Sequence, residues 1–330
     1  MTRSVSTART LITDDGVPID AAHLPGPGDL AIIVAHGFTQ CWQRPSVWRI
    51  ATRLSRIAGV VSFDFRGHGR SGGLSTMGDK EVRDLDVAVA YARDLGYTRI
   101  AAVGFSMGAS VVIRYAGLIG GLDAAVSVSS PGRWFYRGTW PMRRVHWAAE
   151  RRAGRLMTRA LLKTRVSSAR WNPPPVPPAE AAARISPTPL LIVHGDKDLF
   201  FPVDHAQQIY DAARDPRELW LVPGFGHAEA ACQPALVDRI GGWVTEAAGD
   251  AGARAATAAG DGAAVAAARP HHGAAAVAEQ TAEAAGAAAP GAVIAPAEAI
   301  RAGRASLPPG TSLPPGTSLP PGASLPPGKE

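Results

Sequence analysis

Six short apolar runs constrain the fold of this chain more than any other feature. They cover residues 30–37, 59–65, 99–105, 123–130, 190–195 and 218–224. The runs are rich in aliphatic residues and lack the alternation of apolar and polar positions that marks a half-buried strand, as is typical of strands buried on both faces. Helix-like stretches separate them, among them residues 80–95 and 107–119. Alternating strands and helices predict an α/β fold with a mostly parallel sheet and helices on both faces.

The segment before these runs predicts a hairpin. Residues 7–24 contain two polar–apolar stretches on either side of Asp15-Gly16, a dipeptide that favours a tight turn between antiparallel strands. We therefore expect an N-terminal antiparallel hairpin to join the parallel strands, which gives a sheet of eight strands from the six runs and the hairpin.

Two segments interrupt this pattern. Residues 131–186 have no strand-like run, carry four tryptophans and end in a proline-rich stretch. We interpret them as a helical, Arg- and Trp-rich cap inserted into a core formed by residues 1–130 and 187–248. Residues 249–330 contain no Phe, Trp or Tyr, include 28 Ala, and end in four repeats that begin SLPPG. Such repeats cannot bury a core, so a disordered Ala/Gly-rich tail is expected.

The positive charge of the chain is concentrated in the cap. The net charge is +6 and the pI is about 9.7, yet residues 133–170 alone hold eleven basic residues and one acidic residue. One face of a predicted cap helix carries Arg151, Arg155, Arg159 and Lys163, and another carries Ala149, Ala153, Leu156, Ala160 and Leu161. This basic amphipathic pattern indicates either the solvated outer face of a lid or a surface for anionic lipid or acidic substrates. No recognition motif accompanies the charge, so no binding to nucleic acid is expected.

No feature of the sequence indicates export, membrane spanning or a metal site. The N-terminus lacks an apolar core followed by a cleavage site, and no stretch approaches about 18 apolar residues. The two cysteines, Cys41 and Cys232, form neither a CxxC pair nor a Cys/His metal spacing. We expect a soluble cytoplasmic protein without cofactor or metal, and the sequence leaves the oligomeric state open.

The pentapeptide GFSMG (residues 104–108) follows the third apolar run and precedes a helix-like stretch. A G-x-S-x-G motif in this strand–turn–helix context is typical of a nucleophile elbow, in which a sharp turn exposes the serine. Gly104 and Gly108 would leave space where the strand and the helix pass closely. Ser106 is therefore the predicted nucleophile, and the N–H of Met107 is expected to point toward the same space.

A serine nucleophile needs a base, and His227 is the predicted one. It lies in a glycine-rich loop that follows the last apolar run, where it can reach Ser106 over the edge of the sheet; His205 remains a competitor. The stretch HGDKD closes the preceding run and offers Asp196 and Asp198 as orienting carboxylates. We favour Asp198, which lies deeper in the loop, and expect Asp196 to support the loop backbone by a local turn.

The motifs HGF, FDFRGHGRSGG, GFSMG, HGDKD and GFGHAE each follow one of the runs and together resemble those of the α/β-hydrolase fold over residues 8–247. In detail the chain is similar to capped carboxylesterases and monoacylglycerol-lipase-like enzymes. The resemblance implies the triad Ser106, Asp198 and His227. It implies an oxyanion hole formed by the N–H groups of Phe38 and Met107. The residues expected to support the oxyanion loop and the elbow are His36, Gly37, Gly104 and Gly108. The residues expected to line the substrate pocket are Phe105, Trp134, Phe135 and Trp140.

The charged loop 66–73 lacks the spacing of a phosphate-binding loop. In the fold that the chain resembles it is a structural element. We expect Asp64 and Arg66 to pair there and to take no part in catalysis.

These residues predict a cofactor-free serine hydrolase that cleaves carboxylic esters with small acyl or lipid-like groups through an acyl-enzyme. A thioesterase or an acyltransferase would use the same residues, and no motif separates them. A non-catalytic module that binds a membrane surface or a partner through the basic cap is a further alternative, although it would not need a complete triad. Dehalogenases and epoxide hydrolases need Asp at the elbow, so Ser106 excludes both.

Overall fold

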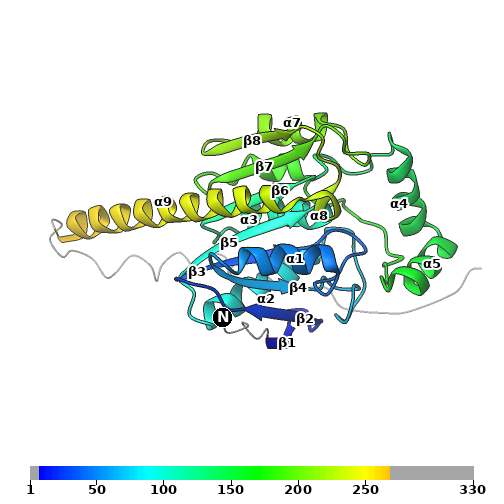
Figure 1. The fold of residues 1–330 in the computed structure, drawn as a ribbon, viewed down its shortest axis with the longest axis horizontal. Helices are drawn as coiled ribbons and strands as arrows, with labels where there is room; N and C mark the ends of the chain where they lie inside the picture. The colour runs from blue at the N-terminus through cyan, green and yellow to red at the C-terminus, as the bar shows by residue number, and fades with distance from the viewer. Residues whose placement is uncertain (1–6, 268–330) are drawn as a thin grey trace, which may run out of the picture. The chain divides into compact units, whose positions relative to one another are not determined.

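The computed structural model describes the backbone of residues 7–267 and the side chains of residues 8–250. The described residues form one eight-stranded sheet with the order β1-β2-β4-β3-β5-β6-β7-β8 (Figure 1). The strands are β1 (Thr7–Ile12), β2 (Pro18–Leu24), β3 (Leu30–Ala35), β4 (Gly59–Phe63), β5 (Arg99–Phe105), β6 (Ala124–Val128), β7 (Leu190–Gly195) and β8 (Arg217–Val222). β2 pairs antiparallel with β1 and β4, and all other neighbours are parallel. The predicted mostly parallel sheet with an N-terminal hairpin is therefore confirmed.

The hairpin turns where the sequence predicts it. Gly16 has a φ of 78°, in the left-handed region that glycine adopts without steric cost. Its N–H donates to the carbonyl of Thr13 at 2.9 Å, and the N–H of Thr13 donates to the carbonyl of Val17 at 3.1 Å. This closed turn sets the register in which Ile12 faces Pro18.

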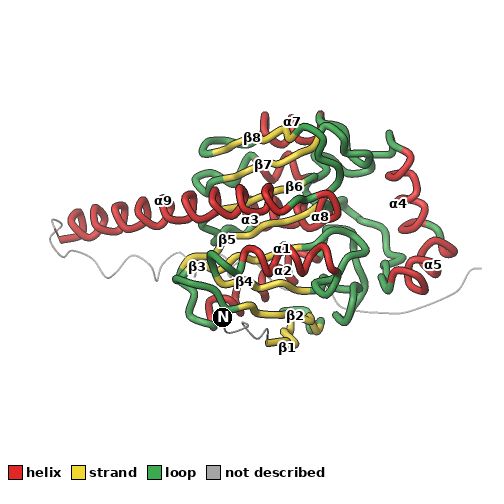
Figure 2. The backbone as a smooth tube through the Cα atoms, in the orientation of Figure 1, coloured by secondary structure: helices red, strands yellow, loops and turns green. Residues whose placement is uncertain are grey.

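Helices cover both faces of the sheet (Figure 2). One face carries α2 (Glu81–Asp94), α3 (Met107–Leu118), α6 (Pro178–Ala182) and α7 (Asp204–Ala212), and the other carries α1 (Pro45–Leu54), α8 (Ala228–Ala231) and α9 (Pro234–Ala267). Successive residues of one strand enter opposite layers: Ile33 packs on the α2–α3 side, whereas Ile32 and Val34 pack on the α1–α9 side. Both faces of these strands therefore need apolar residues, which explains the lack of alternation in the sequence.

α9 extends past the predicted end of the folded core. The core was expected to end at residue 248, whereas α9 continues to Ala267 because its Ala-rich sequence has a high helix propensity. The rest of the predicted tail, residues 268–330 with the SLPPG repeats, lies outside the described residues. Over residues 7–267, no helix is both long and apolar enough to cross a membrane.

Two helices, α4 (Trp140–Glu150) and α5 (Arg152–Leu162), lie within the predicted cap and stand beside each other at one end of the sheet (Figure 1). The single amphipathic helix predicted from Ala149 to Lys163 is broken at Arg151, whose ψ of 138° is extended. The side chain of Arg155 donates to the carbonyls of Ala149 and Glu150 at 3.0 and 2.9 Å. The break is stable because these bonds satisfy carbonyls that the end of α4 would otherwise leave without a partner.

The expected pairing of Asp64 with Arg66 is not found. The Arg66 guanidinium instead lies 2.8 Å from a carboxylate oxygen of Asp84 and 2.8 Å from one of Asp15. The Asp64 carboxylate accepts the backbone N–H of Trp42 at 2.7 Å, so it is already engaged with a neighbouring loop. Asp15 and Asp84 are far from Arg66 in the sequence, so no local pattern indicated these ion pairs.

Candidate active site

Ser106 lies at the turn between β5 and α3. Its φ of 51° and ψ of −112° fall outside the regions that residues with side chains favour. Its N–H donates to the carbonyl of Val128 on β6 at 2.9 Å, which anchors the turn at the end of the sheet. A Cβ atom on Gly104 would lie 2.4 Å from the Gly108 carbonyl oxygen, and one on Gly108 would lie 2.2 Å from the Ala35 carbonyl oxygen. Glycine at both positions allows the close approach that an elbow requires.

Replacing Gly108 with Ala should destabilise the elbow. Because the new Cβ would overlap the Ala35 carbonyl oxygen, we expect the free energy of unfolding to fall by about 1–3 kcal/mol, as in other overpacked sites. Gly242 on α9 is the matched control, since nothing lies within 4 Å of a Cβ built there. Gly242→Ala should raise the free energy of unfolding by about 0.5–1 kcal/mol through helix propensity. Equal changes in the two variants, measured by urea denaturation, would contradict this reading of the elbow.

His227 connects Ser106 to a buried carboxylate. Its Nε2 atom lies 3.0 Å from the Ser106 Oγ, and its Nδ1 atom lies 2.8 and 3.0 Å from the two carboxylate oxygens of Asp198. A carboxylate only accepts hydrogen bonds, so Nδ1 carries the ring proton and Nε2 is free to accept the serine proton. The Phe200 ring stacks on the imidazole at 4.2 Å, which restricts its rotation. The three predicted residues thus meet in one hydrogen-bonded chain.

Asp198 is held in its ionised form. Its side chain is fully buried, and Oδ1 accepts the N–H groups of Phe200 at 2.8 Å and Phe201 at 3.1 Å. Burial raises the pKa of the Asp198 carboxyl, but the hydrogen bond and charge of His227 and the two N–H groups outweigh it, so that the pKa lies below its usual value. An ionised Asp198 can therefore hold the Nδ1 proton of His227 at neutral pH.

The competing residues have other roles. Asp196 accepts the N–H of Gly224 at 2.7 Å, so it braces the loop after β8 rather than its own loop. His205 is buried, and its Nδ1 accepts the N–H of Gly132 at 3.0 Å. Burial lowers the pKa of His205 to about 4. Across the described residues, neither Asp196 nor His205 is hydrogen-bonded to Ser106.

The loop after β3 lies against Ser106. A Cβ on Gly37 would lie 3.3 Å from the Ser106 Cβ. His36 fixes this loop, because its Nδ1 donates to the Gly37 carbonyl at 2.7 Å and its Nε2 accepts the N–H of Phe65 at 3.1 Å. Burial lowers the pKa of His36 to about 3, so the ring is neutral. The ring of His36 therefore links the loop after β3 to the backbone of Phe65.

The two predicted oxyanion donors come from either side of Ser106. Met107 follows it directly and begins α3, and Phe38 follows Gly37 on the adjoining loop. Within the part of the chain that the structure describes, the N–H groups of Phe38 and Met107 have no hydrogen-bond acceptor. Free N–H groups at the start of a helix favour negative charge.

Glu229 is a buried carboxyl in this site that the sequence analysis did not identify. It lies in α8, two residues after His227, and its carboxylate accepts the N–H of Gly37. Both of its carboxylate oxygens would lie 3.3 Å from a Cβ on Gly37. Burial raises the pKa of Glu229, and the Gly37 N–H and the charge of His227 lower it in part. The only sequence signal was an acidic residue in the motif GFGHAE, which by itself indicates no contact.

The four predicted pocket residues occupy different environments. Phe105 is buried in the core on the α1–α9 side, because side chains alternate along β5 and this one faces away from the cap. Trp134 is half-buried, with its ring 5.2 Å from that of Trp171. Phe135 and Trp140 are 59% and 60% exposed. Phe105 is therefore a core residue, and the other three belong to the cap.

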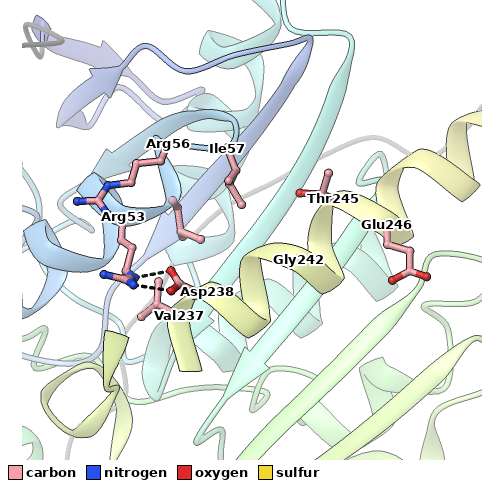
Figure 3. Close-up of a pocket in the computed structure, with 9 residues that line it drawn as sticks. Arg53, Arg56, Ile57, Val237, Asp238, Gly242, Thr245 and Glu246 are labelled. Carbon is pink, nitrogen blue, oxygen red and sulfur yellow. Dashed lines mark hydrogen bonds and ion pairs between the residues drawn. The ribbon is translucent and has the colours of Figure 1, made fainter. Parts of the chain in front are cut away.

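Two hollows differ in their relation to Ser106. One, of about 280 Å³, adjoins the oxyanion loop; core residues Thr39, Gln40, Cys41, Arg44 and Gly69 and cap residues Leu161, Leu162 and Lys163 line it. The other, of about 680 Å³, lies between the end of α1 and α9, where Arg53 pairs with Asp238 (Figure 3). This end of α1 leads into β4. The hollow therefore lies at the amino ends of the parallel strands, opposite the site at their carboxyl ends. In the part of the chain with described side chains, no three His, Cys, Asp or Glu residues are close enough to hold a metal ion.

A serine, a histidine and a buried carboxylate at the carboxyl ends of parallel strands define the hydrolase class of α/β proteins. Residues 32–239 match the alpha/beta hydrolase family, to which the chain belongs. The chain is 26% identical over 253 residues to the monoacylglycerol lipase of Mycolicibacterium smegmatis, covering 64% of this chain and 87% of that protein. It is 23% identical over 223 residues to the uncharacterized protein YfhR of Escherichia coli K12, covering 66% and 71%. The solved structure of the Pyrococcus furiosus esterase Pf2001 has a TM-score of 0.57 and 23% identity, covering 73% of this chain and 92% of that one, and shares the fold.

Proposed function

We propose that this chain hydrolyses carboxylic esters with Ser106 as nucleophile, His227 as general base and acid, and Asp198 as orienting carboxylate. One observation carries the proposal: the imidazole of His227 bridges the Ser106 Oγ at 3.0 Å and the Asp198 carboxylate at 2.8 Å. These distances are those at which a base accepts a hydroxyl proton while its other nitrogen is held.

In the first step, Ser106 Oγ attacks the ester carbonyl carbon as its proton moves to His227 Nε2. The carbonyl oxygen becomes an oxyanion, which the N–H groups of Phe38 and Met107 stabilise, each contributing a factor of about 10²–10³ in rate. His227 then donates its Nε2 proton to the leaving alkoxide oxygen, the C–O bond breaks, and the acyl group stays on Ser106.

In the second step, water repeats this sequence. His227 Nε2 accepts a water proton, the hydroxide attacks the acyl carbon, and the same N–H groups stabilise the second oxyanion. Collapse returns the proton from His227 to Ser106 Oγ and releases the carboxylic acid. Asp198 stays ionised throughout and stabilises the imidazolium that forms twice in each cycle.

We expect lipid-like esters to be the preferred substrates. The 280 Å³ hollow beside the oxyanion loop has two leucines of the cap, Leu161 and Leu162, in its lining. The relative from Mycolicibacterium smegmatis is a monoacylglycerol lipase, which agrees with an apolar acyl group. We therefore expect kcat/KM to rise from acetyl to medium-chain acyl esters, because each CH₂ group that the enzyme buries contributes about 0.8 kcal/mol to binding.

The proposal is tested by pre-steady-state kinetics with p-nitrophenyl esters of increasing acyl length. Formation of an acyl-enzyme should release p-nitrophenol in a burst equal to the enzyme concentration wherever deacylation is slower. Wild-type protein that cleaves none of these esters would refute ester hydrolysis.

Glu229 should act on this reaction by positioning the oxyanion loop. In Glu229→Ala the buried Gly37 N–H loses its acceptor, the loop relaxes, and the Phe38 N–H moves away from the oxyanion. We expect kcat to fall about 10²-fold, the cost of one oxyanion donor, with KM nearly unchanged. Glu229→Gln keeps an acceptor for Gly37 and should recover most of kcat. If Gln and Ala lower kcat equally, or if KM carries the whole effect, Glu229 does not position the loop.

A further inference from the structure

The outer surface of α4 and α5 is unusually apolar for a surface exposed to solvent. No residue of α4 is buried, and in α5 only Gly154 and Thr158 are. Of the fifteen large apolar side chains exposed in the described residues, seven lie between residues 135 and 162. Those on the two helices are Trp140, Trp147, Leu156 and Met157, together with Leu161 and Leu162, which line the hollow beside the oxyanion loop. Exposed apolar patches of this kind mark surfaces that bind a partner or a membrane.

The basic residues of α5 adjoin this apolar surface. Arg152 and Arg159 are two turns apart, so at about 100° per residue they point in nearly the same direction. Leu156 lies between them along the axis and is 59% exposed, and Met157 beside it is 42% exposed. The outward face of α5 therefore carries Arg152, Leu156 and Arg159, whereas Leu161 lies two turns after the buried Gly154 and points in nearly the same direction as Gly154.

The positive charge of this surface is not compensated by acidic side chains. Glu150 is the only acidic residue between positions 133 and 170, and it pairs with Arg137 and His146. Within the described side chains, no carboxylate pairs with Arg152 or Arg159. Arg144 stacks on Trp140 with its guanidinium 4.6 Å from the ring centroid, so even this cation has only an aromatic partner.

We propose that the outer surface of α4 and α5 docks on an anionic phospholipid surface. Helices that lie in a lipid interface place apolar side chains 5–10 Å into the head-group region, with Arg at the phosphates and Trp at the boundary. Each Arg near an anionic membrane strengthens binding about fivefold, and the apolar side chains add to this.

Other occupants fit the surface less well. A second copy of the chain across a twofold axis would bring two copies of the same uncompensated basic surface together, which is repulsive. A nucleic acid would match the charge but leave Leu156 and Met157 exposed to water.

The proposed docking surface adjoins the end of the sheet at which Ser106 and His227 lie. Thr139, just before α4, donates from its hydroxyl to the carbonyl of Phe200 at 2.8 Å, and Phe200 stacks on His227. Leu161 and Leu162 of α5 also line the hollow that contains Thr39, next to Phe38. If the proposed ester hydrolysis holds, a membrane-bound cap would place this hollow beside the lipid from which a substrate leaves.

The surface is tested by vesicle sedimentation with the Ser106→Ala protein, so that binding is measured without turnover. Vesicles of phosphatidylcholine alone are compared with vesicles containing about 30% phosphatidylglycerol. We expect at least tenfold tighter binding to the anionic vesicles, and most of this preference should disappear in 0.5 M salt, where the Debye length falls to about 4 Å.

Matched variants locate the surface. Arg152→Gln/Arg159→Gln should weaken binding to anionic vesicles at least tenfold, whereas Arg56→Gln/Arg214→Gln, which removes the same charge at the opposite edge of the sheet, should change it less than about twofold. Leu156→Ser/Met157→Ser should also weaken binding at least tenfold. Its control is Leu95→Ser/Ile119→Ser, which replaces two exposed apolar residues near the amino ends of the strands.

Several results would overturn the proposal. They are equal binding to neutral and anionic vesicles, no binding to either, and equal effects of the cap and control variants. A further one is a dimer in solution that Leu156→Ser/Met157→Ser dissociates, since a second copy would then cover the surface. Vesicle binding is measured with Ser106→Ala and ester hydrolysis with the wild type. A negative result in one assay therefore does not decide the other.

Discussion

The Ser106→Ala protein should lose about six orders of magnitude in kcat toward an ester that the wild type cleaves, as expected when the nucleophile of a triad is removed. The loss should appear in kcat, because the substrate contacts of the loops and cap remain. Alanine occupies the same strained backbone position, so the free energy of unfolding should change little.

Ser110 provides the matched control for this prediction. It lies one turn further along α3, is buried, and donates to the carbonyl of Met107 at 2.7 Å. Ser110→Ala makes the same chemical change one turn away and should lower kcat less than about tenfold. A Ser106→Ala enzyme within tenfold of wild type would show that another nucleophile performs the reaction.

The second large effect is expected from Asp198→Asn, which should lower kcat about 10⁴-fold. An amide at this position donates to Nδ1 of His227, so the ring proton moves to Nε2, which then cannot accept the Ser106 proton. The fold should be retained, because Oδ1 of Asn can still accept the N–H groups of Phe200 and Phe201.

Asp196→Asn is the control, since it makes the same chemical change two residues away. The Asn oxygen can still accept the Gly224 N–H, and kcat should change less than about threefold. If Asp196→Asn reduces kcat as much as Asp198→Asn, the carboxylate assignment is wrong.

The sequence predicted the sheet and the meeting of three residues for one physical reason. Strands buried on both faces leave continuous apolar runs, and the residues after each run gather at the carboxyl edge of a parallel sheet. Ser106, Asp198 and His227 each follow such a run, so their proximity could be derived without knowledge of any contact. The glycines of the elbow were predictable because only their size allows β5 and α3 to meet.

Contacts between loops were not predictable in the same way. Glu229 reaches Gly37 across 192 positions of sequence, and no local pattern encodes that distance. Phe105 was expected to line the pocket, but alternation along β5 turns its side chain into the core. The break at Arg151 was missed because the charge periodicity continues through it, while the carbonyls of α4 find a partner in Arg155.

Fluorophosphonate labelling followed by peptide mass spectrometry tests directly whether Ser106 is a nucleophile activated by His227. The reagent phosphonylates only a serine that an adjacent base has activated. We expect a single adduct on Ser106 in the wild type, and a rate of labelling at least 10³-fold lower in His227→Ala. An adduct on another residue, or unchanged labelling of Ser106→Ala, would contradict it.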